Sequence, residues 1–588
     1  MSDFIFSAAP LAQFVAESAL QGIYSSTRPE VEFISGNWGC LAYTPNLYHG
    51  FKPLQTEQHI LLVIGGPVLT FTDNGFLAEP DSDKGSQALY QRWLSGDLQW
   101  DTDLSGPFVV VIVDKQQQTL SCITDLMMFI PVYQYHKPEQ LLLSTHVDIL
   151  AQCSGQRTQF DLVSVADFVL NDVITYPYTM YSAIRQCAPA AQQLYRLQQS
   201  IKCDVRPYWQ PQENNPYHDI DAAAAALRAG LRHYVSHVVQ TSDKVAQFIS
   251  GGEDSRALSG LLADYGGRDA FVFLDSLNRE GEIAQQVAAA YGSSFNLKLR
   301  KAGYYLDILP AASKLIGAGH QYMHAHTLGF YQDCKLAQYQ AVFGGYLADS
   351  LLKAPYANKK GGSRKFPFIP ERVVPGESRT TATKHAFFNA KVLQQLDARR
   401  LAHMQRIQQI RPQSAHEWFV LWPSTMRVAL PNLYCNRRLF RSYEPFMCQQ
   451  VVKIAAAVPA DWKLNRRLFH RGCKPFLRKS KWILHADGRL PYWSWWQNMP
   501  VQLLIWSWRH LAKKLGLVRG NQDSWTDLQS LASTPQWLQL ERQTQASLGY
   551  VQALINTEGS TVPTLELFSR SKKINLFQVL YFIEKSHL

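Results

Sequence analysis

The order of apolar and polar positions divides the chain into a β-rich front part and an α/β part that follows it. Several short strands separated by polar turns such as DKQQQ predict a β sandwich or another layered β domain. These apolar, β-branched runs lie at 59–66, 107–114, 119–124 and 140–145. We expect 167–197 to close this domain with a hairpin and 205–218 to form a linker.

The pattern changes after Asp219. Residues 222–239 are rich in alanine with helical spacing, and two later apolar runs, 245–250 and 270–275, are each followed by a helical segment. Alternating strands and helices predict an α/β domain with a parallel sheet. From about 355 to 480 the chain is helical and basic.

Length and composition indicate a globular protein of several domains. The 588 residues suffice for two or three domains, and 46% hydrophobic residues exclude a mostly disordered chain. The 58 basic residues exceed the 47 acidic ones, and the net charge of +11 favours anionic partners such as nucleotides. Because no RRM, KH or zinc-finger signature is present, nucleic acid is not an expected partner.

The nine cysteines are widely spaced, without a CxxC pair or a Cys/His cluster. This spacing argues against a zinc site and is typical of reduced cytoplasmic thiols. The first residues lack the features of a secretory signal, and no run of about 18 apolar residues is present. We therefore expect a cytoplasmic protein without a transmembrane segment.

The sharpest motif is FISGGEDSR at 248–256, where an apolar strand runs into Ser250, Gly251 and Gly252 and a helix begins near Asp254 and Ser255. Two glycines let the backbone approach an anion closely, and a helix N-terminus supplies unpaired N–H groups. Both serines can donate hydrogen bonds to phosphate oxygens, and Asp254 suits a phosphate that carries Mg²⁺. The alternative interpretation is a tight turn in which Asp254 caps the helix. The GxxxxGK[ST] motif is absent.

The SGGxDS loop resembles the pyrophosphate-binding loop of ATP pyrophosphatases, in the form used by the asparagine synthetase family. The resemblance implies ATP and Mg²⁺ as cofactors, cleavage of ATP between its α and β phosphates, and an acyl-adenylate that an amine attacks. The residues that it places around ATP and pyrophosphate are Ile249, Ser250, Gly251, Gly252, Asp254, Ser255 and Phe273. Of these, Ile249 and Phe273 correspond to positions that contact adenine.

A second landmark, FGGYLADS at 343–350, is similar to the family's Gly-x-Gly-x-Asp element. It places Asp349 at the second metal-binding aspartate and Gly345 near the nucleotide. Two aspartates on separate strand ends that face one Mg²⁺–pyrophosphate form a charge clamp. Leu347 stands where the family has a glycine, and a turn with a helix-capping Asp349 is the alternative interpretation.

Tyr346 lies in the same element. Asparagine synthetases carry a glutamate at this place, whereas the similar beta-lactam and carbapenam synthetases carry a catalytic tyrosine. A tyrosine paired with a carboxylate can act as a general base on the attacking nitrogen. Its glutamate partner remains open among Glu371, Glu377 and Glu417, and simple packing of Tyr346 beside the loop is the alternative.

The segment 441–448 resembles the family's R-x-PF-x-D sequence, with Cys448 in place of the aspartate. The helix and loop that follow, 451–472, are similar to those that precede the family's catalytic lysine, which stabilises charge on the adenylate. The residues that compete for this role are Lys474, Lys479, Lys481 and Arg489.

Residues 105–150 resemble the glutamine amidotransferase domain of asparagine synthetases. The matching positions are Gly106, Phe108, Asp114, Asp125, Pro131, Tyr133 and the closing LSTHVDIL. Glutaminases of this type need a cysteine at the mature N-terminus. This chain begins Met1-Ser2-Asp3, and its first cysteine is Cys40. We expect the fold to be kept and glutaminase activity lost, with Ser2 as the one residue in the position of a nucleophile.

The end of the chain is rich in tryptophan between 492 and 508. Five apolar residues share one helix face there: Leu503, Leu504, Trp508, Leu511 and Leu515. Packing of this helix on the preceding domain is the more common outcome. A peripheral membrane contact or a groove for a protein partner is the functional alternative.

These features predict an α/β plus β protein. An N-terminal Ntn-hydrolase-like β sandwich over 1–210 precedes a parallel-sheet α/β domain of the ATP pyrophosphatase, or adenine nucleotide α hydrolase-like, type over 215–588. The function that follows is an AMP-forming, ATP- and Mg²⁺-dependent ligase that joins a small-molecule or peptide carboxylate to an amine without glutamine, as lasso peptide cyclases do. The alternatives are an asparagine synthetase, a sugar-acid amidotransferase of surface polysaccharides, and a non-catalytic nucleotide-binding scaffold.

Overall fold

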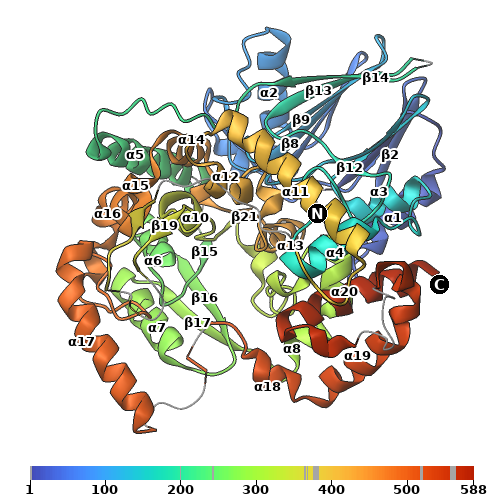
Figure 1. The fold of residues 1–588 in the computed structure, drawn as a ribbon. Helices are drawn as coiled ribbons and strands as arrows, with labels where there is room; N and C mark the ends of the chain where they lie inside the picture. Colours follow the sequence, from blue (N-terminus) through green and yellow to red (C-terminus); the bar gives the residue numbers. More distant parts are fainter. Residues whose placement is uncertain are drawn as a thin grey trace.

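The computed structural model describes residues 3–198, 200–240, 244–265, 267–362, 366, 368–374, 383–516, 521–522, 524–555 and 564–587. It contains a two-sheet β unit and a unit built on a parallel sheet (Figure 1). Within these residues, no helix is both long and apolar enough to cross a membrane.

The β unit consists of two six-stranded antiparallel sheets. The first has the order β12 (Arg185–Gln186), β10 (Tyr133–Lys137), β11 (Gln140–Ser144), β1 (Phe4–Ser7), β3 (Gly39–Tyr43) and β2 (Glu32–Gly36). The second has the order β14 (Lys202–Pro207), β13 (Ala191–Arg196), β9 (Thr119–Thr124), β8 (Phe108–Asp114), β5 (His59–Gly65) and β4 (Leu54–Gln55). Alternate side chains such as Phe4, Leu62 and Val111 meet in one core between the sheets.

Helices cover the outer faces of this sandwich. They are α1 (Gln13–Gly22), α2 (Lys84–Leu94), α3 (Val147–Cys153) and α4 (Leu162–Asn171). The expected hairpin over 167–197 is wrong, because its first residues continue α4 and its last ones form β13, which pairs with β9 and β14. The helical signal was weak because seven of the ten residues of α4 are buried and none is exposed, so polar residues do not mark an outer face. Asp161 caps α4 by accepting the Val163 and Ser164 N–H groups.

The second unit is built on a five-stranded sheet in which every recorded strand pair is parallel. Its order is β17 (Ser294–Leu299), β16 (Arg268–Leu274), β15 (Val245–Phe248), β18 (Ala341–Phe343) and β21 (Ser442–Tyr443). The helices between and around these strands include α5 (Ile220–Val239), α6 (Glu253–Leu261) and α7 (Arg279–Tyr291). Because the strands are parallel, the segments that follow β15, β16, β18 and β21 all leave the same edge of the sheet.

Further helices surround this sheet and connect it to the sandwich (Figure 1). They are α10 (Ala348–Leu352), α11 (Ala390–Ile410), α12 (Ala415–Leu421), α13 (Pro431–Leu439), α14 (Gln449–Ala457), α16 (Arg467–Cys473), α17 (Trp495–Lys514), α19 (Pro535–Ala546) and α20 (Arg570–His587). Both α11 and α20 pack against α4 of the front unit, and α17 lies at the outer edge of the molecule.

A buried ion-pair cluster joins the two units. Asp3, which precedes β1, accepts hydrogen bonds from Arg437 at 2.9 Å and from Arg438 at 2.7 and 2.8 Å, both from α13. The hydroxyl of Thr145 donates to the same carboxylate at 2.8 Å. Although burial opposes it, the two guanidinium groups hold the pKa of Asp3 far below its ordinary value. Asp3 is therefore a structural carboxylate between the two units.

Candidate functional site

The loop between β15 and α6 is a closed turn held by its own hydroxyl and amide groups. The hydroxyls of Ser250 and Ser255 lie 2.9 Å apart, and the Ser250 hydroxyl accepts the Gly252 N–H at 3.1 Å. The Gly251 N–H donates to the Glu280 carboxylate at 2.8 Å, and a Cβ on Gly251 would come within 2.8 Å of that same carboxylate. Because α6 begins directly after Gly252, its N-terminus and both hydroxyls lie together at the sheet edge.

The loop after β18 packs against the first. A Cβ on Gly345 would lie 3.2 Å from the Ser255 amide nitrogen, so a side chain there would press into the start of α6. Leu347 takes the left-handed conformation, with φ of 67°. Its side chain is buried, and it keeps the backbone shape for which a glycine is the ordinary choice. Leu347 thus adopts a left-handed conformation without being a glycine, and the chain continues directly into α10, which contains Asp349.

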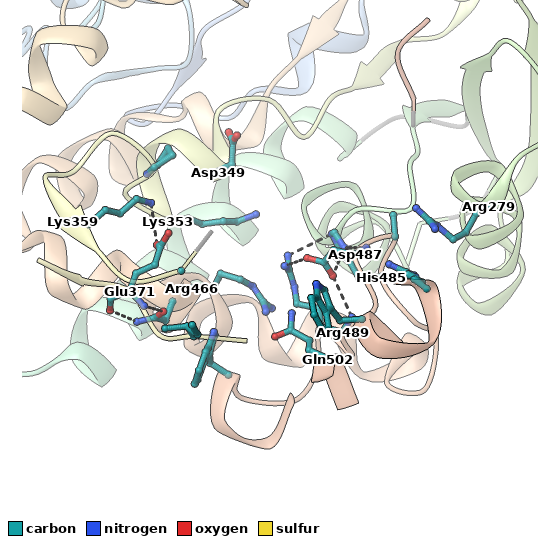
Figure 2. A pocket seen from close by; sticks show the side chains of 18 of the residues that line it. Arg279, Asp349, Lys353, Lys359, Glu371, Arg466, His485, Asp487, Arg489 and Gln502 are labelled. Carbon is teal, nitrogen blue, oxygen red and sulfur yellow. Dashed lines mark hydrogen bonds and ion pairs between the residues drawn. The ribbon is translucent and has the colours of Figure 1, made fainter. Parts of the chain in front are cut away.

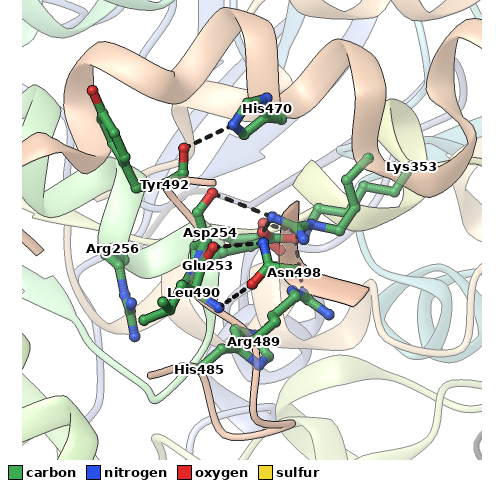
Figure 3. A network of polar contacts seen from close by, with 12 residues as sticks. Glu253, Asp254, Arg256, Lys353, His470, His485, Arg489, Leu490, Tyr492 and Asn498 are labelled. Carbon is green, nitrogen blue, oxygen red and sulfur yellow. Dashed lines mark hydrogen bonds and ion pairs between the residues drawn. The ribbon is translucent and has the colours of Figure 1, made fainter. Parts of the chain in front are cut away.

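Acidic and basic side chains meet where the two loops adjoin (Figure 3). Lys353 forms a close ion pair with Asp254 and a second one with Glu253 at 2.9 Å. The pKa of Asp254 is raised to about 6, because burial and the nearby charges of Glu253 and Asp349 together outweigh the opposing effect of Lys353. A divalent cation at this carboxylate would relieve that repulsion.

Glu253 is the anchor of this cluster. Arg466 donates to its carboxylate at 2.7 Å and Arg489 at 3.1 Å. Burial alone would raise the pKa of Glu253, but these arginines and Lys353 hold it well below the ordinary value. Glu253 therefore stays ionised and positions three cations around the start of α6.

The oxygen ligands at the loop fit Mg²⁺ that arrives with phosphates. Among the residues described, no group of three or more His, Cys, Asp and Glu side chains is close enough to hold a metal ion by itself. Mg²⁺ in nucleotide sites commonly uses one or two carboxylates, and phosphate and water oxygens complete its octahedron. Asp254 and the exposed Asp349, whose charge is felt at Asp254, match this requirement.

Two cavities flank the Asp254–Lys353 pair. The smaller one, of about 300 Å³, combines apolar walls from Ile249 and Phe273 with polar groups from Tyr346 and Glu444. The ring of Phe273 stacks on Phe330 with centroids 4.6 Å apart, which fixes its face. A flat aromatic wall with a few polar groups suits a nucleobase and its sugar.

The larger cavity, of about 760 Å³, opens beside Asp349 and Lys353 (Figure 2). Its cationic lining residues are Arg279, Lys353, Lys359, Arg466, Arg489 and Arg509. Such a lining favours anionic groups, including pyrophosphate. The sequence-predicted residues Ile249, Ser250, Asp254, Ser255, Phe273, Gly345 and Tyr346 all line the smaller cavity, and Asp349 lines the larger one.

Tyr346 is held by a glutamate that sequence reasoning missed. Its backbone N–H donates to Glu444 at 3.1 Å, and Ser442 donates to the same carboxyl group at 3.3 Å. Burial raises the pKa of Glu444 to about 8. The signal available in the sequence was the position of Glu444 directly before Pro445-Phe446, in a segment that resembles one of the family.

The phenol of Tyr346 is influenced by the charge of Arg427, whose guanidinium lies 5.5 Å from the centre of the Tyr356 ring. Burial raises the pKa of Tyr346, and the charge of Arg427 partly offsets this effect. Arg427 is 7% exposed, and its Nε and Nη1 groups have no hydrogen-bond partner among the residues described. The Tyr346 hydroxyl likewise has none there. The Tyr356 ring gives this buried guanidinium a cation–π contact, and its Nε and Nη1 groups keep the capacity to donate hydrogen bonds to an acceptor.

The glutamates expected to pair with Tyr346 lie elsewhere. Glu417 forms a buried pair with Lys463 at 2.8 Å, and Glu371 pairs with Lys359 at 3.0 Å on the wall of the larger cavity. Glu377 lies outside the described residues. Neither of the two described candidates is recorded in contact with Tyr346, whereas Glu444 is.

Of the four basic candidates, Arg489 is the one recorded in contact with the loop, through Glu253. Lys474 and Lys481 lie over the rings of Tyr492 and Trp482 instead. Lys479 lines a separate cavity beside Phe476. Lys353 was missed in the sequence analysis. It directly follows α10, four residues after Asp349, and residues at this spacing on a helix are neighbours.

The front unit offers no activated thiol among its described residues. Cys40 is buried, its Sγ contacts the Ala9 carbonyl at 3.8 Å, and burial raises its pKa. A thiol with a raised pKa is a poor nucleophile. Ser2 lies outside the described residues, and its neighbour Asp3 is locked by Arg437 and Arg438.

Comparison with known proteins identifies both units. Residues 226–491 match the family model for asparagine synthase, and residues 84–209 match the model for a glutamine amidotransferase domain. Together with the antiparallel sandwich and the parallel sheet, these matches give an Ntn-hydrolase-like front unit followed by an α/β synthase unit. They show that both units are similar to domains found in the asparagine synthetase family.

No curated protein matches the chain significantly. Solved structures that match part of the chain include the allosteric regulatory enzyme of purine biosynthesis (9% identity, 51% of this chain, 65% of that one, TM-score 0.24). Another is glutamine phosphoribosylpyrophosphate amidotransferase from B. subtilis with ADP and GMP (10% identity, 51% of this chain, 66% of that one, TM-score 0.21). The chain thus spans just under two thirds of the length of each.

Proposed function

We propose that the protein is an ATP- and Mg²⁺-dependent ligase that converts a substrate carboxylate into an acyl-adenylate and passes it to an amine without using glutamine. One observation carries this proposal: Asp254 of the SGGEDS loop pairs with Lys353 and lies near the charge of Asp349, at one edge of the sheet. A scaffold that only binds nucleotide has no need of a charge clamp for a leaving group.

Each part of the site has a role in this reaction. Ile249 and Phe273 would hold adenine, and the hydroxyls of Ser250 and Ser255 would hold the departing phosphates. Asp254 and Asp349 would hold Mg²⁺, which when bound supplies neutralisation of the phosphate charge. The cations that Glu253 positions, Lys353 and Arg489, add to the same neutralisation.

The amide-forming step needs a proton acceptor. The amine nitrogen attacks the acyl carbon, the bond from that carbon to the AMP oxygen breaks, and AMP leaves with the electron pair. The nitrogen must then lose a proton, and Tyr346 and Glu444 line the cavity in which the nucleotide is proposed to bind. The Glu444 pKa of about 8 suits a group that exchanges protons near neutral pH.

The substrate class follows from the cations that face this step. The charge of Arg427 acts on the Tyr346 phenol, and its Nε and Nη1 groups have no hydrogen-bond partner among the described residues, so it suits the carboxylate or a second anionic group of the acceptor. Two features support the proposal that the attacking amine belongs to the substrate itself, as in a peptide cyclase. Tyr346 stands at this place, and the described part of the front unit has no activated thiol. The nine cysteines form no disulfide, which supports a cytoplasmic location.

Nucleotide product analysis tests the proposal. Purified protein would be incubated with Mg²⁺-ATP and either aspartate or a pool of peptides and sugar acids, each with ammonia, with glutamine, or with neither. AMP and pyrophosphate without an added nitrogen source support the ligase. If AMP forms only when glutamine is added, the protein has kept glutaminase activity. Formation of asparagine from aspartate and ammonia would indicate an asparagine synthetase. Binding of ATP without any formation of AMP would indicate a scaffold.

Replacing Glu444 by glutamine should separate the two half-reactions. Because burial raises the pKa of this carboxyl to about 8, the fraction that can accept a proton grows as the pH rises toward 8. We expect amide formation in the native protein to rise over that range and the Glu444→Gln variant to lose this rise, with a rate about 10²- to 10⁴-fold lower. ATP–pyrophosphate exchange, which reports adenylation alone, should be retained.

The control for this prediction is Glu371→Gln, which changes a glutamate on the wall of the other cavity. It should keep the rise toward pH 8. Loss of the rise in Glu371→Gln, or its retention in Glu444→Gln, would remove Glu444 from the proton-transfer step.

A further inference from the structure

The outer side of α17 exposes large apolar side chains along most of the helix, with a few polar residues between them. Trp496 is 68% exposed, Leu504 71% and Trp508 62%. The same stripe, spaced by three or four residues along the helix, also includes Met499, Leu503, Leu511 and Leu515. An isolated exposed leucine is ordinary, but a continuous apolar stripe of this size marks an interaction surface.

This exposure does not come from a detached helix, because the opposite face of α17 is packed. Asn498, Gln502 and Ala512 are buried. The side-chain amide of Asn498 donates to the carbonyls of Leu490 and Trp493 at 2.9 and 2.8 Å, which fixes the start of the helix. The helix is therefore held with its apolar stripe outward, at the edge of the molecule (Figure 1).

The charges near this stripe are of one sign. Between 488 and 522 the sequence has no aspartate or glutamate. Of its five basic residues, Arg489 pairs with Glu253 and Arg509 lines the larger cavity. The other three follow one another in the sequence at the end of the helix and after it: Lys513, Lys514 and Arg519. A groove that binds a protein partner commonly has a polar rim with charges of both signs. Helices that lie on anionic lipid instead combine Trp and Leu on one face with cations beside them. The net charge of +11 adds to the attraction.

We propose that the outer face of α17 docks the protein onto an anionic lipid surface. The tryptophan and leucine side chains enter the boundary between headgroups and acyl chains, and the exposed Lys514 at the end of the helix contacts the headgroups. The inner side of the same helix contributes Trp506, Arg509 and Gln502 to the 760 Å³ cavity (Figure 2). Docking by α17 thus brings this cavity next to the membrane surface.

Vesicle co-sedimentation tests this proposal with the full chain. The probes are vesicles of phosphatidylcholine alone and vesicles of equal parts phosphatidylcholine and phosphatidylserine. The variant is the double change Leu504→Asp and Trp508→Asp, which places two negative charges on the stripe. The matched control is Phe14→Asp on α1, since Phe14 is 72% exposed and lies far from α17 in the fold. Circular dichroism and thermal unfolding of each variant establish that it is folded.

We expect the native protein and Phe14→Asp to sediment with the anionic vesicles and to be released by salt. The double variant should bind at least about tenfold more weakly, which is about 1.4 kcal/mol. Failure of the native protein to bind anionic vesicles would overturn the proposal. Self-association of the native protein that Leu504→Asp and Trp508→Asp abolish, without vesicle binding, would assign the stripe to a second copy and overturn it as well.

Discussion

Asp254→Asn will lower the rate of AMP formation by about 10²- to 10³-fold, the usual effect of removing one group that stabilises charge in a transition state. The change preserves the size of the side chain and removes its negative charge. Asparagine can still accept a hydrogen bond, but it neither pairs with Lys353 as an anion nor binds Mg²⁺ as strongly as a carboxylate does. ATP–pyrophosphate exchange measures the loss directly, because it does not require the amine.

The matched control is Glu282→Gln. Glu282 lies in the first turn of α7, the helix that follows the neighbouring strand β16, and it is exposed. Like Asp254, it is an acidic residue in the first turn of a helix that follows a strand of the same sheet, but it has no recorded contact with Lys353 or Asp349. Unchanged exchange in a folded Asp254→Asn variant, or equal losses in both variants, would show that Asp254 does not serve the pyrophosphate.

The part of this site that could be predicted from sequence is the part that is local in sequence. Ser250, Gly251, Gly252 and Ser255 lie within six residues, and their geometry follows from a strand, two glycines and a helix start. The parallel sheet was likewise predicted from the alternation of strands and helices. Local backbone preferences and hydrophobic periodicity are sufficient for such features.

The residues that were missed depend on contacts distant in sequence. Glu444 reaches Tyr346 across 98 positions because β21 pairs with β18, and no pattern within either segment indicates that pairing. Lys353 reaches Asp254 across 99 positions by the same adjacency of strand ends. The exposure of α17 also had no local signal, because an amphipathic helix gives the same sequence pattern whether its apolar face is covered or open.

Asp3 is the extreme case, since its partners Arg437 and Arg438 lie more than 430 positions away. Asp3→Asn will destabilise the protein by about 3–5 kcal/mol, because it leaves two buried guanidinium groups without their anion. This is a large part of the stability of an ordinary domain, so the thermal midpoint followed by tryptophan fluorescence should fall by several degrees. The control is Lys453→Met. Its pair with Asp101 also joins the two units at 2.8 Å but is partly exposed, so the change should cost about 1 kcal/mol or less.

The pH dependence of stability gives a second measure of the same cluster. The pKa of Asp3 is lower in the folded protein than in the unfolded chain, so the folded protein binds this proton more weakly than the unfolded chain does. Its contribution to stability is therefore complete above the ordinary aspartate pKa of about 4 and is lost as the pH falls below that value. Asp3→Asn should remove this part of the acid sensitivity, whereas Lys453→Met should keep it. Equal acid sensitivity in the native protein and Asp3→Asn would mean that the two units are held together mainly by other contacts, such as those of α11 and α20 with α4.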